Sequence, residues 1–197
     1  VEEPEGLTAG GIHDMWQRPA VDTGQICPFA GKGGRYLVLG PGQPDMQVEG
    51  YETVSVGTNN TNIAFRVLDP REDVAARIVS ELKIYPYEER DNPPQTRIVP
   101  AAGLSWIAGG PEGIAYWERL ADILNREPVD DRDKMMTAML RPLGIVHGQP
   151  FQPDARQREI LEQAALVGLA MSRANGYAKR LEGSRVWPDR RWEMSLM

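Results

Sequence analysis

Cysteine and histidine are scarce in this sequence. It contains one cysteine, Cys27, and two histidines, His13 and His147, among 197 residues. A single cysteine excludes an intrachain disulfide and a cysteine-ligated metal cluster. Because neither histidine has a histidine or cysteine two to four residues away, the spacing predicts no zinc site, and we expect no metal or other cofactor. Between apolar neighbours, Cys27 is expected to pack as a small apolar side chain.

An excess of positive charge and a long hydrophobic run are also missing. The chain carries 28 acidic and 22 basic side chains, a net charge of -6, and residues 101–197 hold 13 of each sign. Binding to nucleic acid needs basic side chains that neutralise phosphates, so we expect no nucleic-acid partner. No apolar run reaches the roughly 18 residues of a membrane-spanning helix. None resembles a signal peptide either, although processing would have removed one.

Glycine and proline are abundant instead, with 20 and 16 residues. They are densest in residues 1–34, where they interrupt helical and strand periodicity and predict an irregular arm. Beyond the arm, apolar and β-branched runs predict three strands that pair in order as an antiparallel meander, with Gly40-Pro41-Gly42 as a hairpin turn. The predicted strands are residues 35–39, 51–56 and 63–68.

One helix follows these strands. Val74, Ile78 and Leu82 recur at a spacing of four residues, which is typical of a helix with one buried face. A short strand is predicted directly after it, over residues 83–87. This part of the chain is therefore expected to form a mixed unit of sheet and helix.

The second half of the chain is predicted to be helical. Prolines and charged residues are typical of a linker before it, and apolar residues then recur at helical spacing over residues 111–125, 131–140 and 153–181. The sequence thus predicts an α+β fold, in which a small antiparallel, sandwich-like β-sheet with one helix precedes a three-helix segment. The predicted divisions are residues 1–90 for the arm, sheet and helix, 91–110 for the linker and 111–197 for the helical segment.

No complete catalytic motif occurs in the sequence. The tract Gly31-Lys32-Gly33-Gly34 differs from a phosphate-binding loop, because a glycine follows the lysine and a strand, not a helix, comes next. We expect these glycines to provide positive φ angles or close backbone approach instead. The Gly-x-Ser-x-Gly pattern of serine hydrolases is absent as well.

Three blocks of sequence carry a family resemblance. They are residues 19–24, residues 31–42, which begin Gly-Lys-Gly-Gly-Arg-Tyr-Leu, and Gly50-Tyr51. Together they resemble the bacterial domain-of-unknown-function family numbered 1254, and further blocks extend the similarity over residues 15–193. Cys27-Pro28-Phe29 departs from the Gly-Pro-Asp that is usual in the family. Its usual companion, the jelly-roll-like C-terminal domain numbered 1214, is missing, and with the start at Val1 this favours a fragment or a processed product.

The resemblance implies a bacterial and commonly exported protein with a β-sandwich-like part and a helical part. A periplasmic or secreted location follows from it, while a cytoplasmic location stays open. The resemblance implies no established reaction, so it assigns no catalytic residue in this sequence.

Two classes of function therefore remain, and whether the protein is an enzyme is left open. In the first, the chain is a binding, interaction or structural module of a larger two-domain protein, and its helical segment contacts the missing C-terminal domain or a second copy. In the second, it contributes to a hydrolytic enzyme whose site lies between this chain and the missing β-sandwich domain. The polar candidates for ligand binding are Asp22, Lys32, Arg66 and His147.

Overall fold

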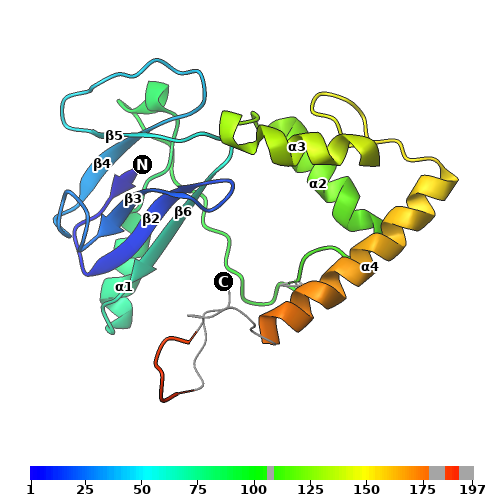
Figure 1. Cartoon of the computed structure of the whole chain (residues 1–197). Helices are drawn as coiled ribbons and strands as arrows, with labels where there is room; N and C mark the ends of the chain where they lie inside the picture. The colour runs from blue at the N-terminus through cyan, green and yellow to red at the C-terminus, as the bar shows by residue number, and fades with distance from the viewer. Residues whose placement is uncertain (106–108, 178–184, 191–197) are drawn as a thin grey trace. The chain divides into compact units, whose positions relative to one another are not determined.

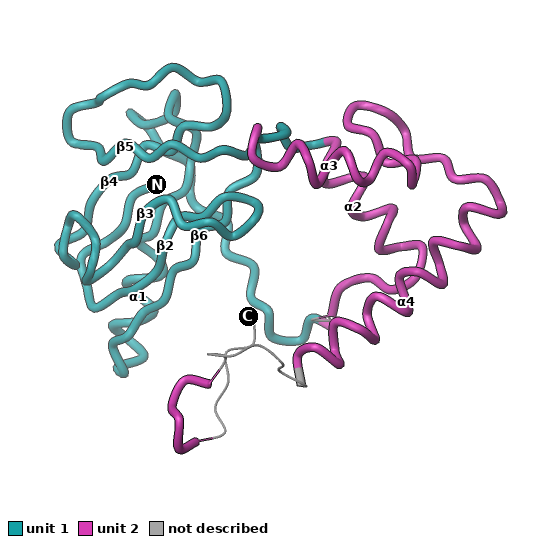
Figure 2. The backbone as a smooth tube through the Cα atoms, viewed as in Figure 1, with its two compact units in different colours: residues 1–104, 126–130 teal, residues 105–125, 131–197 magenta. Residues whose placement is uncertain are grey.

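The computed structural model describes residues 1–105, 109–177 and 185–190. Contacts between residues divide the chain into two compact units (Figure 2). Unit 1 comprises residues 1–104 and 126–130, and unit 2 comprises residues 105–125 and 131–197. The linker predicted over residues 91–110 stays a prediction.

Unit 1 contains two three-stranded sheets (Figure 1). In the first sheet, the short strand β1 (Glu2–Glu3) pairs antiparallel with β4 (Gly34–Leu39). The other edge of β4 pairs in parallel with β5 (Glu52–Ser55), so that Tyr36 lies opposite Glu52.

The second sheet is fully antiparallel. Its central strand β2 (Thr8–Asp14) lies between β3 (Pro19–Gly24) and β6 (Thr61–Val67). Along β6 the side chains alternate between exposed and half-buried, as expected for a strand with one face toward the core and one toward solvent.

One hydrophobic core receives side chains from both sheets. Ile12 on β2 is fully buried, and Tyr36 on β4 and Val54 on β5 are 1% and 5% exposed. Val56, just after β5, belongs to the same cluster. The Phe29 ring packs edge-on against Tyr36, with ring centroids 5.2 Å apart.

The predicted meander is wrong, although its three strands exist. Because β5 runs parallel to β4, the loop of residues 40–51 must return to the opposite end of the sheet, and parallel strands cannot be joined by a hairpin. Gly40-Pro41-Gly42 therefore forms a turn, in which Gln43 N donates to Gly40 O (3.3 Å), but no hairpin. The third strand, β6, pairs with β2 in the other sheet.

The irregular arm predicted over residues 1–34 is also wrong, because it contains β1, β2 and β3. The glycines there permit close packing of the backbone. A Cβ atom on Gly10 in β2 would overlap the backbone carbonyl of Ala64 on β6, and one on Gly24 would overlap Thr8. Glycine is therefore required inside these strands. The same density of glycine is the feature from which the sequence predicts an irregular arm.

The predicted helix before residue 83 is confirmed as α1 (Glu72–Glu81), and Ile78 on it is fully buried. The strand predicted over residues 83–87 is wrong. Lys83 makes only an isolated bridge to Glu2, and a 3-10 helix, η1 (Tyr87–Glu89), follows.

Arg71, the residue just before α1, forms hydrogen bonds and an ion pair with Asp69. Asp69 Oδ1 accepts hydrogen bonds from the Arg71 backbone N (3.0 Å) and Nε (2.9 Å), and Oδ2 accepts one from Nη2 (2.7 Å). The Arg71 side chain and then its backbone lower the pKa of Asp69 to about 2. Since the folded-state pKa is depressed, the stabilisation is present above the unfolded value of about 4 and is lost as the pH falls toward 2.

We expect Arg71→Gln to raise the pKa of Asp69 toward its ordinary value, because the charged donor is removed. An NMR titration of the Asp69 carboxyl carbon measures this shift. Arg77→Gln, which removes the pair between Arg77 and Glu81 on the same helix, is the control and should leave the Asp69 titration unchanged. An Asp69 pKa that stays near 2 in Arg71→Gln would contradict this electrostatic explanation.

The helical segment is confirmed in the second half of the chain. Its helices are α2 (Ile114–Arg126), α3 (Lys134–Leu140) and α4 (Ala155–Tyr177), and short 3-10 turns, η2 (Asp131–Asp133) and η3 (Arg141–Leu143), flank α3. Together with the sheets of unit 1, these elements make the chain an α+β protein, as the sequence predicts. Among the described residues, none of the helices combines the length and the apolar character that crossing a membrane requires.

Candidate functional site

Two of the predicted residues, Asp22 and Arg66, share one face of the second sheet. Asp22 on β3 lies opposite Gly11 on β2, and Arg66 on β6 lies opposite Ala9. Because positions two apart in a strand point to the same side, these pairs occupy the same face. Both Asp22 and Arg66 are exposed.

The other two predicted residues lie in separate parts of the chain. Lys32 is exposed in the turn between β3 and β4, and its backbone N donates to Phe29 O (3.0 Å). His147 belongs to unit 2, where it is exposed in the loop after η3. The roles of all four candidates in ligand binding stay predictions.

The glycine tract behaves as predicted. Gly31 and Gly33 have φ angles of +76° and +74°, in the left-handed region that side chains disfavour. Gly34 has an ordinary φ, but a Cβ atom there would overlap the Phe29 ring. The tract is therefore a tight structural entry into β4.

A buried acid, Glu3, organises the interior next to this tract. Its side chain is among the least exposed polar groups, and Oε1 accepts a hydrogen bond from Thr8 Oγ1 (2.8 Å). Oε2 accepts from Gly24 N (3.2 Å) and from the Tyr36 hydroxyl (3.4 Å). Burial first, and then Cys27 and Glu3, raise the pKa of Tyr36, so its phenol keeps its proton.

Cys27 makes polar contacts beside this network. Its Sγ donates to Gly24 O (2.8 Å) and accepts from Phe29 N (3.2 Å), while the residue is half-buried. The thiol thus helps to fold the turn before β4. Sequence reasoning missed Glu3, because it lay within the supposed irregular arm.

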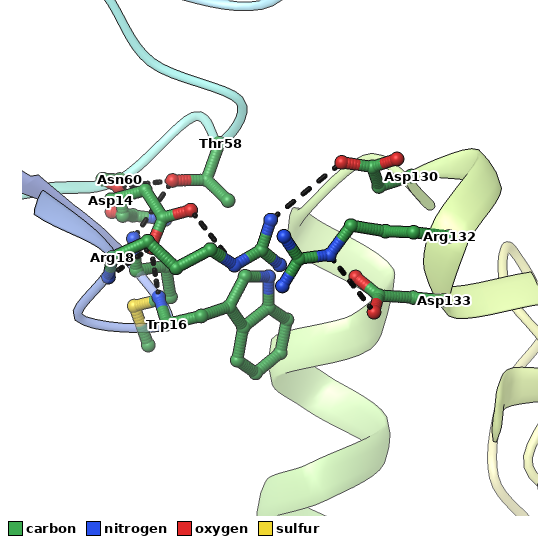
Figure 3. Close-up of polar contacts among 9 residues, drawn as sticks. Asp14, Trp16, Arg18, Thr58, Asn60, Asp130, Arg132 and Asp133 are labelled. Atoms are coloured by element: carbon green, nitrogen blue, oxygen red, sulfur yellow. Dashed lines mark hydrogen bonds and ion pairs between the residues drawn. The ribbon is translucent and has the colours of Figure 1, made fainter. Parts of the chain in front are cut away.

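Around the β2–β3 turn, Asp14 and Arg18 form a second polar network (Figure 3). Asp14 Oδ1 accepts from the backbone N of Trp16 (2.8 Å) and of Arg18 (2.9 Å), and Oδ2 lies 3.4 Å from Arg18 Nε. Arg18 Nη1 lies 3.6 Å from Asp130 Oδ2. The arginine therefore links the turn to the segment after α2, across more than 100 residues of sequence.

Glu127 fastens the same segment to the loop after β5. Its side chain is 2% exposed, and Oε2 accepts from Asn59 N (2.5 Å). Oε1 accepts from the backbone N (3.2 Å) and the side-chain Nδ2 (2.5 Å) of Asn60. Asn59 Nδ2 donates in turn to Arg126 O (2.6 Å). Nothing in the sequence around Glu127 distinguishes it from the exposed acids nearby.

These networks are structural in geometry. Each buried carboxyl described above accepts several hydrogen bonds from its own fold. Within the described residues, no group of three or more His, Cys, Asp or Glu side chains is arranged to hold a metal ion.

Unit 2 contains a cavity of about 540 Å³ between residues 109–117 and α4, which we call the α4 cavity. Its walls include the aromatic side chains of Tyr116 and Trp117, and its α4 side includes Ala164 and Gly168. The volume lies within the range of small-molecule sites. Sequence reasoning missed this cavity, although Gly168 was visible as a small residue within a helix.

Comparison with known proteins supports the family resemblance for the first part of the chain. Residues 2–86 match the family model described as "Protein of unknown function (DUF1254)". The resemblance is thus confirmed over these residues, while the blocks that extended it toward residue 193 lie outside the match. Among curated proteins, none matches this sequence significantly.

The fold is similar to that of a solved protein. The crystal structure of the VPA0106 protein from Vibrio parahaemolyticus matches with a TM-score of 0.59 and 14% sequence identity. The match covers 87% of this chain and 44% of that protein, so this chain spans less than half of the length of its structural relative. At this identity the likeness concerns the fold alone.

Proposed function

We propose that this chain is a binding module of a larger protein and that its helical unit packs against another domain of the same polypeptide. The observation that carries the proposal is an apolar stripe on α4. Ile160, Val167 and Met171 follow at spacings of seven and four residues, which places them on one face of the helix. Their exposed fractions are 56%, 56% and 61%.

Another face of α4 already packs within unit 2. Leu161 is 3% exposed, and its carbonyl accepts a hydrogen bond from Trp117 Nε1 (2.8 Å). Glu162 Oε2 accepts one from the backbone N of Ile114 (2.5 Å). The stripe is thus additional to the face that holds α2. Full burial of each such aliphatic side chain stabilises an interface by roughly 1.5–3 kcal/mol, which favours an arrangement that covers the stripe.

Helix α3 adds a second apolar surface to unit 2. Met135, Met136 and Met139 are 73%, 60% and 63% exposed. Methionine side chains are flexible and polarisable and adapt to the shape of a partner. Exposed apolar surface of this kind is typical of interaction sites.

The comparisons favour a domain of the same polypeptide as the partner. The chain spans 44% of the length of the VPA0106 protein, so the shared fold is accompanied there by a larger remainder. The family resemblance implies a C-terminal companion domain in addition. We therefore assign the stripe on α4 to a contact with such a domain.

Without that domain the chain is expected to self-associate through the stripe. Sedimentation velocity over a concentration series should give an average mass that rises above the 21.9 kDa of one chain. Val167→Glu should return it to a monomer, because a charge at a buried interface is costly. Ala76→Glu, an exposed position on α1, is the matched control and should leave the association unchanged. A monomer at every concentration would count against the proposal.

Export to the periplasm or outside the cell is the second part of this proposal. It rests on the resemblance to a commonly exported bacterial family, which the match over residues 2–86 supports. Fractionation of cells that express the natural gene would locate the protein, and a purely cytoplasmic location would contradict this part alone.

A further inference from the structure

We propose that the α4 cavity binds a small amphipathic acid, with its apolar or aromatic body inside the cavity and its anionic group on Arg173. This inference concerns the α4 cavity, whose lining on α4 begins beside the exposed stripe at Ala164 and continues to Arg173, and it does not depend on a partner domain. It rests on how the cavity is built, on what lines it and on the charges at its rim.

The cavity is held open by specific contacts between α4 and the start of α2. Glu162 accepts the backbone hydrogen bond of Ile114, and a side chain at Gly113, where φ is +60°, would overlap the Glu162 carboxyl. One turn along α2, Trp117 Nε1 donates to Leu161 O. These contacts fix the separation of the two walls and orient the indole ring.

The interior of the cavity is mostly apolar and is shaped by small residues. Ala164 and Gly168 lie one turn apart on α4, and a Cβ atom built on Gly168 meets nothing within 4 Å. Across from them, the rings of Tyr116 and Trp117 meet edge to face, with centroids 5.1 Å apart. Flat aromatic walls opposite a helix with short side chains favour a planar or branched apolar group.

Polar groups gather at one end of the lining. Arg173 and Ser172 provide hydrogen-bond donors, and Glu112 Oε1 lies 3.6 Å from Arg173 Nη2. The side chains of Arg173 and Glu112 are 67% and 60% exposed, and exposed ion pairs contribute little to stability. Arg173 can therefore exchange Glu112 for a ligand anion at low cost, and its planar group matches a carboxylate or sulfonate.

The probe for this site is 8-anilinonaphthalene-1-sulfonate, an aromatic anion whose fluorescence rises in apolar surroundings. We expect saturable binding with one site per chain. Arg173→Gln should weaken it about tenfold, because a charge-assisted hydrogen bond is lost. Glu112→Gln should strengthen it about threefold, because the competing acid is removed. N-phenyl-1-naphthylamine, which is neutral, should be insensitive to both changes.

Filling the cavity provides a test that does not depend on charge. Gly168→Leu places a large side chain among the lining residues and improves the helix propensity of the position, so α4 should stay folded. It should abolish saturable binding of both dyes. Gly176→Leu, a second open helical glycine on α4 outside the cavity, should preserve it.

Matched controls separate this site from other surfaces. Arg158→Gln and Glu118→Gln remove a second exposed pair between α2 and α4, and Val167→Glu alters the apolar stripe. None of the three should change the affinity of the anionic dye. The proposal is overturned if Arg173→Gln and Glu112→Gln shift the affinity in the same direction, or if Gly168→Leu still binds the dye. Loss of dye binding in Val167→Glu would likewise place the dye on the stripe and refute it.

Discussion

Replacing Gly33 by valine is expected to lower the free energy of unfolding by about 3 kcal/mol or more. Gly33 has a φ of +74°, which a β-branched residue adopts only with strain. A Cβ atom would also lie 2.8 Å from Glu5 N and 2.9 Å from Glu3 O. Glu3 O belongs to β1 and Glu5 N to the backbone just after it, so neither can move without disturbing the pairing of β1 with β4.

Gly42→Val is a matched control for this prediction. Gly42 has the same φ of +74°, but a Cβ atom there meets nothing within 4 Å. Its cost should therefore be the backbone strain alone, about 1–2 kcal/mol. Urea unfolding of both variants measures the difference. Equal losses at the two positions would mean that the backbone around Gly33 yields and that close packing there is unimportant.

Replacing Glu127 by alanine is the second change with a large expected effect, a loss of about 3 kcal/mol. The carboxyl accepts hydrogen bonds from the backbone of Asn59 and from the backbone and side chain of Asn60. Removing it takes away hydrogen bonds to a charged acceptor, each worth roughly 1.5–3 kcal/mol, and removes the packing of a side chain that is 2% exposed. The loop after β5 would also lose its anchor on residues 126–130.

Glu118→Ala provides the comparison for Glu127→Ala. Glu118 belongs to the same helical region, is about half exposed and pairs with Arg158, so its loss should cost less than about 1 kcal/mol. A double-mutant cycle of Glu127→Ala with Asn60→Ala should give a coupling energy above about 1 kcal/mol, because the two side chains share a hydrogen bond. Additive effects would show that Glu127 stabilises the fold without Asn60.

The sequence predicted helices more reliably than strand partners. The spacing of Val74 and Ile78 predicted α1, and Ile78 is buried as expected. Helical spacing likewise located α2 and α4, because helical hydrogen bonds join residues four apart. By contrast, the sequence predicts β4, β5 and β6 as strands of one sheet, whereas β6 belongs to the other sheet. The alternation of apolar and polar residues indicates which face of a strand is buried, but it does not identify the neighbouring strand.

The polar networks were hidden from the sequence for a related reason. In the sequence, Glu3 and Glu127 resemble ordinary surface acids. Only the fold places Gly24 N within hydrogen-bond distance of Glu3 and Asn59 N within hydrogen-bond distance of Glu127. The α4 cavity depends in the same way on residues about 50 positions apart, such as Tyr116 and Gly168. Asp22 and Arg66 are polar candidates in the sequence, but their shared face follows only from the register of β2 with β3 and β6.

The sequence by itself determined the α+β class, the helical second half, the conformation of the glycine tract and the family resemblance of the first part. Each of these depends on properties of residues close together in the chain: periodicity, backbone freedom and short motifs. Only the tertiary structure decided which strands pair, which acids are buried and where α4 leaves a cavity and an apolar stripe. Those features arise from contacts between distant segments. Gly10 and Gly24, for example, are required because backbone atoms of a neighbouring strand lie where a Cβ atom would be.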